Sequence, residues 1–281
     1  MEFETLRLAG DGLTLAADAI GDPAAPPVLF FHGGGQSRRS WRGAARRIAE
    51  AGYRALTFDL RGHGDSDWAS DGDYLLDAYA RDVGCLVEGL GRKVALVGAS
   101  RGGQAALVGG TRHPEKVALI MLADVAPLIS DMGVDRIRAF FWASNAGFTS
   151  LEEAAAVLSR LLERPPVEDN SGLAKALRTG SDGRLYWHWD PRTVAPEFLN
   201  PPSEGQAINA AAARARMQLV LVRAEHSDIV TDEGVRLFRS LAPQLIVREA
   251  KGAGHMFTSD RNDAFAAALH EFLQTTLPVK S

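Results

Sequence analysis

The sequence predicts an α/β fold, and two observations support this class. Short runs rich in leucine and β-branched residues alternate with longer alanine-rich stretches over much of the 281-residue chain. This alternation is typical of parallel strands that are buried on both faces and joined by crossover helices. With 46% hydrophobic residues, the chain can also bury a large core as one domain that carries an insertion.

Eight runs are predicted to be strands. The first two, residues 3–8 and 13–20, are separated by a turn short enough for a hairpin, and we expect them to form an antiparallel edge on a mainly parallel sheet. The other strands are expected at residues 28–31, 53–58, 93–97, 117–122, 218–222 and 244–249. Helices are expected between them, at residues 42–50, 75–90, 101–112, 232–241 and 260–276.

Between residues 125 and 217 the alternation stops, and helical, aromatic-rich sequence takes over. An insertion at this point follows the sixth strand and lies over the carboxyl edge of the sheet, where open α/β sheets bind ligands. We therefore predict a core formed by residues 1–124 and 218–281, and a helical cap without strands formed by residues 125–217.

Composition excludes several classes of protein. The formal net charge of −4, from 31 Lys and Arg against 35 Asp and Glu, offers no basic surface, so we expect no nucleic-acid partner. Cys85 is the only cysteine, which excludes an intramolecular disulfide and thiolate metal clusters and fits a reducing compartment. The start has no signal-peptide pattern, and the longest apolar run, residues 117–129, is interrupted by Asp124 and Pro127. We therefore expect a soluble, cytoplasmic protein with no membrane partner.

One serine lies where a predicted strand meets a predicted helix. The stretch Gly98-Ala99-Ser100-Arg101-Gly102 matches the G-x-S-x-G pattern of a nucleophile elbow, a turn too tight for bulky side chains two residues before and after the serine. Such a turn lifts the hydroxyl above the sheet and places it near a helix N-terminus, where negative charge is favoured. The pentapeptide alone also fits a serine helix cap between loop glycines, but the flanking strand and helix favour the nucleophile.

A serine nucleophile needs a base, and the base needs a group that orients it. His255 follows the last predicted strand and Asp228 follows the strand before it, so the chain order is Ser100, Asp228, His255, as expected with such an elbow. Asp124 also ends a strand and is the alternative acid. We predict Asp228 as the acid and Asp124 as a support for the loop that enters the insertion.

Glycines after an early strand are predicted to stabilise the negative oxygen of the reaction. In the stretch HGGG the backbone can approach a substrate closely, so we predict the N–H group of Gly34, with Gly35 as its alternative, as one oxyanion donor. The second donor is the N–H group of Arg101, the residue after the nucleophile. A phosphate loop would need a following G-K-[ST], which the sequence lacks. His32 is expected to orient this loop by hydrogen bonding, and His63 is expected at the surface or in a loop.

Taken together, these segments resemble the α/β-hydrolase superfamily, specifically its compact capped members related to esterases, perhydrolases and enol-lactone or carbon–carbon hydrolases. The resemblance covers nearly the whole chain, through HGGGQS, FDLRGHGDSD, GASRGG, HPEKVALIMLADVAP, VLVRAEHSDIV and GAGHMF in the family's order. It implies an eight-stranded, mostly parallel sheet with an antiparallel second strand, helices on both faces and a helical cap after the sixth strand.

The resemblance also implies acyl transfer from the substrate to Ser100 and then to water, with neither a cofactor nor a metal. The family often has methionine, leucine or glutamine after the serine; Arg101 here either binds a substrate carboxylate or forms a salt bridge. An epoxide hydrolase or dehalogenase of this fold carries aspartate at the elbow, so the serine argues against both.

We therefore predict a serine hydrolase that cleaves a small carboxylic ester or lactone. Aromatic residues of the insertion indicate an apolar pocket, and the predicted substrate contacts are Gly35, Trp142, Trp187 and His188. The alternatives are a perhydrolase or carbon–carbon hydrolase with nearly the same machinery, or a ligand-binding receptor with slow hydrolysis. The expected partners are the small-molecule substrate and water, for a monomer or a homodimer.

Overall fold

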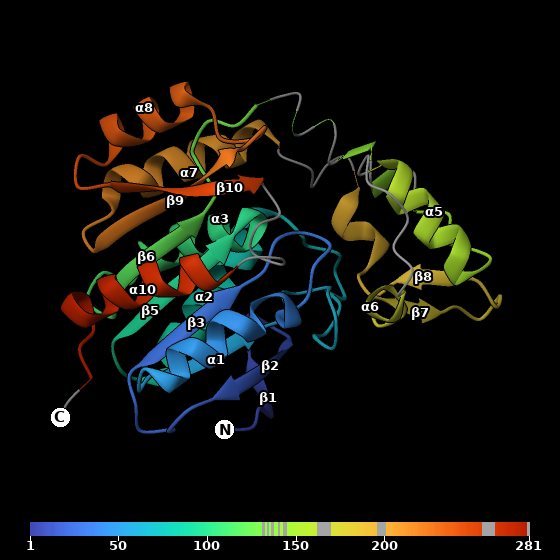
Figure 1. Ribbon diagram of the computed structural model, residues 1–281, viewed down its shortest axis with the longest axis horizontal. Helices are drawn as coiled ribbons and strands as arrows, with labels where there is room; N and C mark the ends of the chain where they lie inside the picture. Colours follow the sequence, from blue (N-terminus) through green and yellow to red (C-terminus); the bar gives the residue numbers. More distant parts are fainter. Residues whose placement is uncertain are drawn as a thin grey trace.

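The apolar runs of the chain form one eight-stranded sheet with helices on both faces (Figure 1). The computed structural model describes residues 1–130, 133, 135, 138–139, 141–142, 145–161, 170–195, 201–254 and 262–279. The strands of the sheet are β1 (Glu4–Ala9), β2 (Thr14–Ile20), β3 (Pro27–Phe31), β4 (Arg54–Phe58), β5 (Val94–Ala99), β6 (Val117–Ala123), β9 (Gln218–His226) and β10 (Ile246–Gly254). All eight predicted strands are confirmed, and β9 and β10 extend further along the chain than expected.

The sheet has the strand order β1-β2-β4-β3-β5-β6-β9-β10. Strand β2 pairs antiparallel with both β1 and β4, and the remaining pairs are parallel. The predicted antiparallel edge is therefore confirmed. The parallel strands bring their carboxyl ends to a common edge of the sheet, which is where open α/β sheets place their sites.

Two apolar clusters cover the two faces of the sheet. Successive residues of a strand point to opposite faces, so Leu29 belongs to one cluster and Phe30 to the other. The Phe30 side is covered by α1 (Arg42–Glu50) and α10 (Asn262–Thr276), which lie in front of the sheet in Figure 1. The Leu29 side is covered by α2 (Leu76–Leu90), α3 (Ser100–Gly110), α7 (Pro202–Arg214) and α8 (Asp232–Leu241). Both faces of the sheet are therefore buried.

The described elements of the insertion that precede helix α7 (Pro202–Arg214) lie to one side of the sheet in Figure 1. They are α5 (Leu151–Leu161), α6 (Ser171–Ala174), β7 (Leu177–Thr179), β8 (Leu185–Trp187) and the 3-10 helix η2 (Pro191–Val194). They have an apolar cluster of their own, which includes Phe148, Trp187 and Trp189. A small second core therefore stabilises this part of the chain.

The prediction that the insertion has no strands is wrong. Strands β7 and β8 form a two-stranded antiparallel sheet. Between them Gly183 has a left-handed φ of 79°, and its N–H group donates to Gly180 O at 3.1 Å. The strands are only three residues long, so their alternation was too short to separate from the helical sequence around them.

Helix α7 lies within the predicted cap but packs with the core. Ile208, Ala211 and Ala212 of this helix, followed by Met217, belong to the same apolar cluster as the sheet. The helix thus brings the chain back from the insertion to β9. The division of the chain into residues 1–124 with 218–281 and residues 125–217 remains a prediction.

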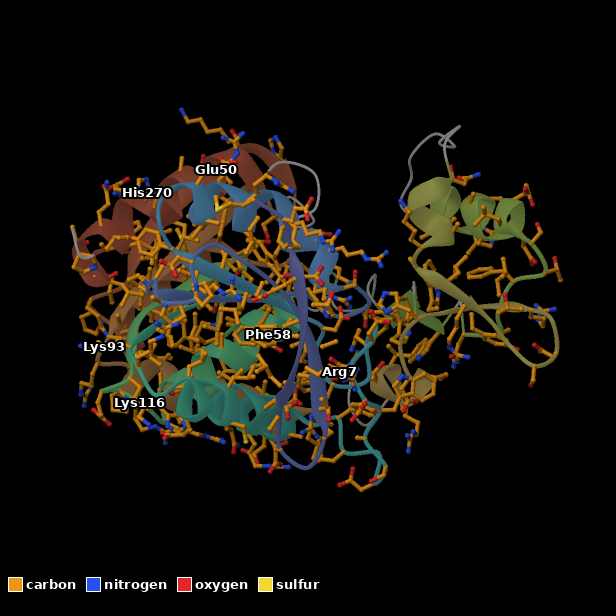
Figure 2. All side chains as sticks on the ribbon, turned by 90° about the horizontal axis from the view of Figure 1, so that it is seen from below. Arg7, Glu50, Phe58, Lys93, Lys116 and His270 are labelled. Atoms are coloured by element: carbon orange, nitrogen blue, oxygen red, sulfur yellow. The ribbon has the colours of Figure 1, made fainter. Side chains whose placement is uncertain are left out.

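Three charged side chains labelled in Figure 2 lie at the outside of the body. Figure 2 shows Phe58 of β4 inside the body, whereas Arg7, Lys93 and Lys116 lie at its periphery. Among the residues that the structure describes, none of the helices combines the length and the apolar character needed to cross a membrane.

Candidate active site

Ser100 lies in a tight turn where strand β5 passes directly into helix α3. Its φ of 45° is in the left-handed region, which a residue with a side chain adopts only when its surroundings impose it. A Cβ atom at Gly98 would lie 2.6 Å from the amide nitrogen of Gly103, and one at Gly102 would overlap the carbonyl oxygen of His32. The predicted strand-to-helix turn and its need for glycine at both positions are confirmed.

Asp124 occupies the equivalent position on the neighbouring strand. Ala99 and Ala123 are partners in the β5–β6 register, so Ser100 and Asp124 each follow a paired residue by one position. Asp124 is buried and also has a positive φ, 52°. The register therefore brings a buried carboxylate and the serine to the same edge of the sheet.

The carboxylate of Asp124 holds the turn that follows β9. Its Oδ1 accepts the N–H group of Ala224 at 3.1 Å, and its Oδ2 accepts the hydroxyl of Ser227 at 2.6 Å. The Ser227 Oγ in turn accepts the N–H group of Val230 at 2.8 Å. Asp124 was expected to support the loop that enters the insertion; these bonds instead support the turn that carries Asp228.

The predicted acid and base follow adjacent strands. Asp228 is half-buried in the turn after β9, and β9 pairs with β10 up to the partners His226 and Gly254. His255 is the next residue after β10, and it lies outside the described residues. The arrangement of Ser100, Asp228 and His255 as a triad therefore remains a prediction.

The glycine stretch after β3 lies beside the serine. A Cβ atom at Gly33 would be 3.2 Å from the Cβ atom of Ser100. The N–H group of Gly33 donates to Gln36 Oε1 at 2.9 Å, and that of Gly35 donates to His63 Nε2 at 3.2 Å. Between them, the N–H group of Gly34 makes no hydrogen bond to any described residue, and Gly34 is exposed. Gly34 is thus the amide of this stretch that remains available to a ligand.

Two buried histidines hold the peptide groups of this stretch. His32 Nε2 accepts the N–H group of Leu60 at 3.0 Å, so its Nδ1 carries the proton that it donates to Gly33 O at 2.7 Å. Burial lowers the pKa of His32 to about 3, although the Gly33 carbonyl opposes the shift. The prediction that His32 orients the glycine stretch is confirmed.

His63 is the second of these histidines, and of the two predicted locations, surface or loop, the structure shows the loop. It belongs to a loop but is only 2% exposed. Its Nδ1 bonds to the carbonyl of Arg61 at 3.0 Å. Burial, reinforced by the neighbouring His32, lowers the pKa of His63 to about 3. Both imidazoles are therefore neutral over the physiological pH range.

Asp59 connects the loop that contains His63 to the segment that follows the glycine stretch. One carboxylate oxygen accepts the N–H group of Arg38 at 2.7 Å, and the other accepts the N–H group of Asp65 at 3.0 Å. The guanidinium of Arg38 forms buried ion pairs with Asp59 and Asp18. Burial alone would lower the pKa of Arg38, but these carboxylates raise it above its ordinary value. The loop at residues 59–66 therefore has a fixed structural role beside the site.

Residues of the insertion reach the same loop. His188 Nδ1 accepts the N–H group of Gly64 at 2.9 Å, and the N–H group of Asp190 donates to Gly62 O at 2.7 Å. The hydroxyl of Tyr74 donates to Asp190 Oδ2 at 2.7 Å. The loop consequently contacts the glycine stretch on one side and the insertion on the other.

The aromatic residues predicted to contact substrate differ in exposure. Trp187 is 8% exposed and stacks on Trp189 with their ring centroids 4.8 Å apart, whereas Trp142 is 55% exposed. A Cβ atom at Gly35 would lie 2.9 Å from Phe141 and 3.4 Å from Trp189, so these rings close against the glycine stretch. Contact of a substrate with Gly35, Trp142, Trp187 or His188 remains a prediction.

The side chain of Arg101 forms the salt bridge that was one of its two predicted roles. Its guanidinium lies 2.7 Å from Glu204 of α7 and 5.7 Å from the ring centre of Tyr79. Glu204 is buried and also accepts the N–H group of Leu76 at 2.7 Å. The backbone of Arg101 belongs to the first turn of α3, as expected for the second oxyanion donor.

Sequence reasoning missed the roles of His63, Asp59 and Tyr74. The signal for His63 and Asp59 was available, because both lie in a glycine-rich loop that directly follows a fully buried strand. Tyr74 pairs with a residue more than a hundred positions away, which no local pattern indicates. In the described ranges, no group of three or more His, Cys, Asp or Glu residues is arranged to hold a metal ion.

The strand order, the turn at Ser100 and the glycine stretch beside it define an α/β-hydrolase fold. Comparison with known families agrees. The chain belongs to the family described as alpha/beta hydrolase fold, whose model matches residues 26–261.

Individual relatives are similar over most of the chain. Esterase Rv0045c of Mycobacterium tuberculosis is 27% identical over 265 residues, which are 90% of this chain and 84% of that protein. The sn-1-specific diacylglycerol lipase ABHD11 of Mus musculus is 26% identical over 263 residues, which are 90% of this chain and 82% of that protein. These relatives support a hydrolase. The crystal structure of E-2-(acetamidomethylene)succinate hydrolase has the same fold, with a TM-score of 0.83 and 23% identity over 98% of this chain and 100% of that one.

Proposed function

We propose that this protein is a serine hydrolase that cleaves a small carboxylic ester or lactone through an acyl-enzyme on Ser100. The observation that carries the proposal is the left-handed turn that holds Ser100 beside the glycine stretch. A serine in such a turn at a helix N-terminus has backbone donors close to its hydroxyl, which is the arrangement that acyl transfer requires.

In the proposed reaction, the Ser100 hydroxyl attacks the ester carbonyl while His255 accepts its proton. The N–H groups of Gly34 and Arg101 stabilise the oxyanion, and Gly34 is suited to this because its amide has no hydrogen-bond partner among the described residues. The bond to the alcohol then breaks, and His255 returns the proton to the departing alkoxide. Water attacks the acyl-serine by the same route and releases the acid.

We retain Asp228 as the acid that orients His255. Each carboxylate oxygen of Asp124 already accepts a hydrogen bond from β9 or its turn, which supports a positioning role for Asp124. Asp228 lies in the turn that these bonds support. Because Asp124 is also adjacent in register to the serine, it remains the alternative acid, and matched variants of the two residues distinguish them.

The substrate assay uses p-nitrophenyl esters from acetate to octanoate, together with a lactone panel. We expect repeated turnover, and we expect Ser100→Ala to lower kcat/KM by roughly a thousandfold or more without loss of folding. Ser240→Ala is the matched control, because Ser240 is exposed on α8 and bonds only within its own helix. Wild-type activity in Ser100→Ala would contradict the nucleophile, and a single burst without turnover would favour a ligand-binding receptor.

A further inference from the structure

We propose that His63 is a positioning residue for the oxyanion site: it fixes the peptide after Gly34 and so holds the glycine stretch, which lies beside Ser100, in the conformation that leaves the Gly34 N–H group open to a ligand oxygen. This inference rests on the proposed function. It concerns a residue that touches neither the serine nor a predicted substrate atom and acts through its hydrogen bond to the glycine stretch.

Three consecutive glycines do not hold one conformation by themselves. Glycine lacks a Cβ atom and populates both signs of φ, and Gly35 has a φ of 73°. An oxyanion donor, however, is effective only when its direction is set before the reaction begins. Contacts from outside the stretch must therefore supply the order that its residues lack.

The first of these contacts comes from His32. Its Nδ1–H group donates to Gly33 O at 2.7 Å. The Gly33 carbonyl and the Gly34 N–H group belong to one planar trans peptide and point in opposite directions. The same carbonyl also accepts the N–H group of Gln36 at 3.1 Å. His32 and Gln36 together therefore set the plane of the peptide that carries the Gly34 N–H group.

The second contact comes from His63, on the other side of Gly34. His63 Nε2 accepts the N–H group of Gly35 at 3.2 Å, which fixes the next peptide plane. The ring cannot turn freely, because its Nδ1 bonds to the carbonyl of Arg61 at 3.0 Å and the side chain is buried. With both flanking peptides held, the Gly34 amide is left as the donor of the stretch that a ligand oxygen can reach.

The same histidine lies next to the contact from the insertion. The ring centroids of His63 and His188 are 6.4 Å apart, and His188 accepts the N–H group of Gly64, the residue after His63. Trp189, 6.4 Å from the His63 ring, closes against Gly35. His63 therefore contacts the glycine stretch that carries the Gly34 donor, and the next residue, Gly64, contacts the insertion.

The test compares His63→Leu, which removes the acceptor, with His63→Gln, whose Oε1 replaces it at a similar reach. We expect His63→Leu to lower kcat roughly 10- to 100-fold with little change in KM, since one oxyanion donor is weakened rather than deleted. His63→Gln should recover most of that loss. Values are expressed per active serine, titrated with a fluorophosphonate, so that loss of folded protein does not count as loss of kcat.

His113→Leu serves as the control for removing a histidine, because His113 bonds to Glu88 on the surface, away from the glycine stretch. Wild-type kcat per active serine in His63→Leu, or equal losses in the Leu and Gln variants, would overturn the inference. If Ser100→Ala kept full activity, the proposed function would fail instead.

A second measurement follows the hydrogen bond without turnover. Amide hydrogen exchange at Gly35 should become faster in His63→Leu and return toward the wild-type rate in His63→Gln. Unchanged protection of the Gly35 amide in His63→Leu would overturn the inference whatever the substrate of the enzyme is.

Discussion

The turn at Ser100 and the insertion are held by different kinds of contact. Strand β5 pairs on both sides, with β3 and β6, and the turn that follows it depends on glycines that touch backbone atoms. The insertion reaches the loop at residues 59–66 mainly through His188 and Asp190. The backbone of the sheet thus sets the geometry of the serine, whereas one side-chain contact and one backbone hydrogen bond connect the insertion to this loop.

Breaking the backbone contacts should have the largest effect. In Gly102→Ala, the added Cβ would overlap the carbonyl oxygen of His32 and lie 2.6 Å from Phe31 carbonyl atoms. We expect a loss of about 3 kcal/mol in the free energy of unfolding, measured by urea denaturation.

Gly205→Ala on α7 is the matched control for this substitution, because no atom lies within 4 Å of a Cβ there. It should stabilise the protein by about 0.5–1 kcal/mol, as alanine does within a helix. Equal stability of Gly102→Ala and the wild type would show that the turn does not need glycine.

The two carboxylates provide the next comparison. We expect Asp228→Asn to lower kcat roughly a hundredfold or more, because an amide favours the wrong histidine tautomer. Asp124→Asn should mainly lower stability, because it weakens the bonds to Ala224 and Ser227. Steady-state kinetics and denaturation of both variants measure the two effects. A much larger kinetic loss in Asp124→Asn would transfer the role of the acid to Asp124.

The buried histidines predict how stability depends on pH. His32 and His63 have a pKa of about 3 in the folded protein, against 6.5 when unperturbed. Below pH 6.5 the unfolded chain binds protons that the folded chain does not, so stability is fully present above pH 6.5 and is lost as the pH falls toward 3.

Between these two pKa values, each of the two imidazoles contributes about 1.4 kcal/mol per pH unit to the slope of the unfolding free energy against pH. His63→Leu should therefore flatten the pH dependence of the unfolding free energy, measured by denaturation at pH 7, 6 and 5. An unchanged slope in this variant would mean that His63 titrates near its ordinary pKa in the folded protein.

The contacts of the insertion should have the smallest effect. Tyr74→Phe removes a hydroxyl that donates to Asp190 at 2.7 Å and accepts the N–H group of Ala69 at 3.0 Å. We expect a loss of about 1–2 kcal/mol in unfolding free energy and a higher KM for the longer esters, with kcat for acetate unchanged. Tyr186→Phe, which removes only an exposed bond to Asp182, should change little. A large fall in kcat for Tyr74→Phe would show that this contact also controls the serine.

The sheet and the elbow could be predicted because each leaves a pattern in the local sequence. A strand such as Val94–Ala99 is buried along its whole length, so it appears in the sequence as an unbroken apolar run. The glycines around Ser100 are needed for contacts within a few residues of the turn and with the adjacent strand. Both features can therefore be recognised in the amino-acid sequence.

The surroundings of the site could not be predicted in the same way. Whether His63 is buried depends on Gly35, His188 and Trp189, which come from distant parts of the chain. The β7–β8 sheet is set by short strands and a turn whose residues also fit loops or helices. In each case the deciding contact is tertiary, so the local sequence carries little of the information.

The ion pair of Arg101 with Glu204 has a consequence for the electrical charge of acceptable substrates. The cation nearest the serine in the sequence is already neutralised by a buried carboxylate. A substrate carboxylate that took this guanidinium as its partner would leave Glu204 as an unpaired buried charge, and breaking a buried ion pair in this way costs about 3–5 kcal/mol. The guanidinium next to the serine in the sequence is therefore committed to joining helix α3 to helix α7, and it is not a ready partner for an anion.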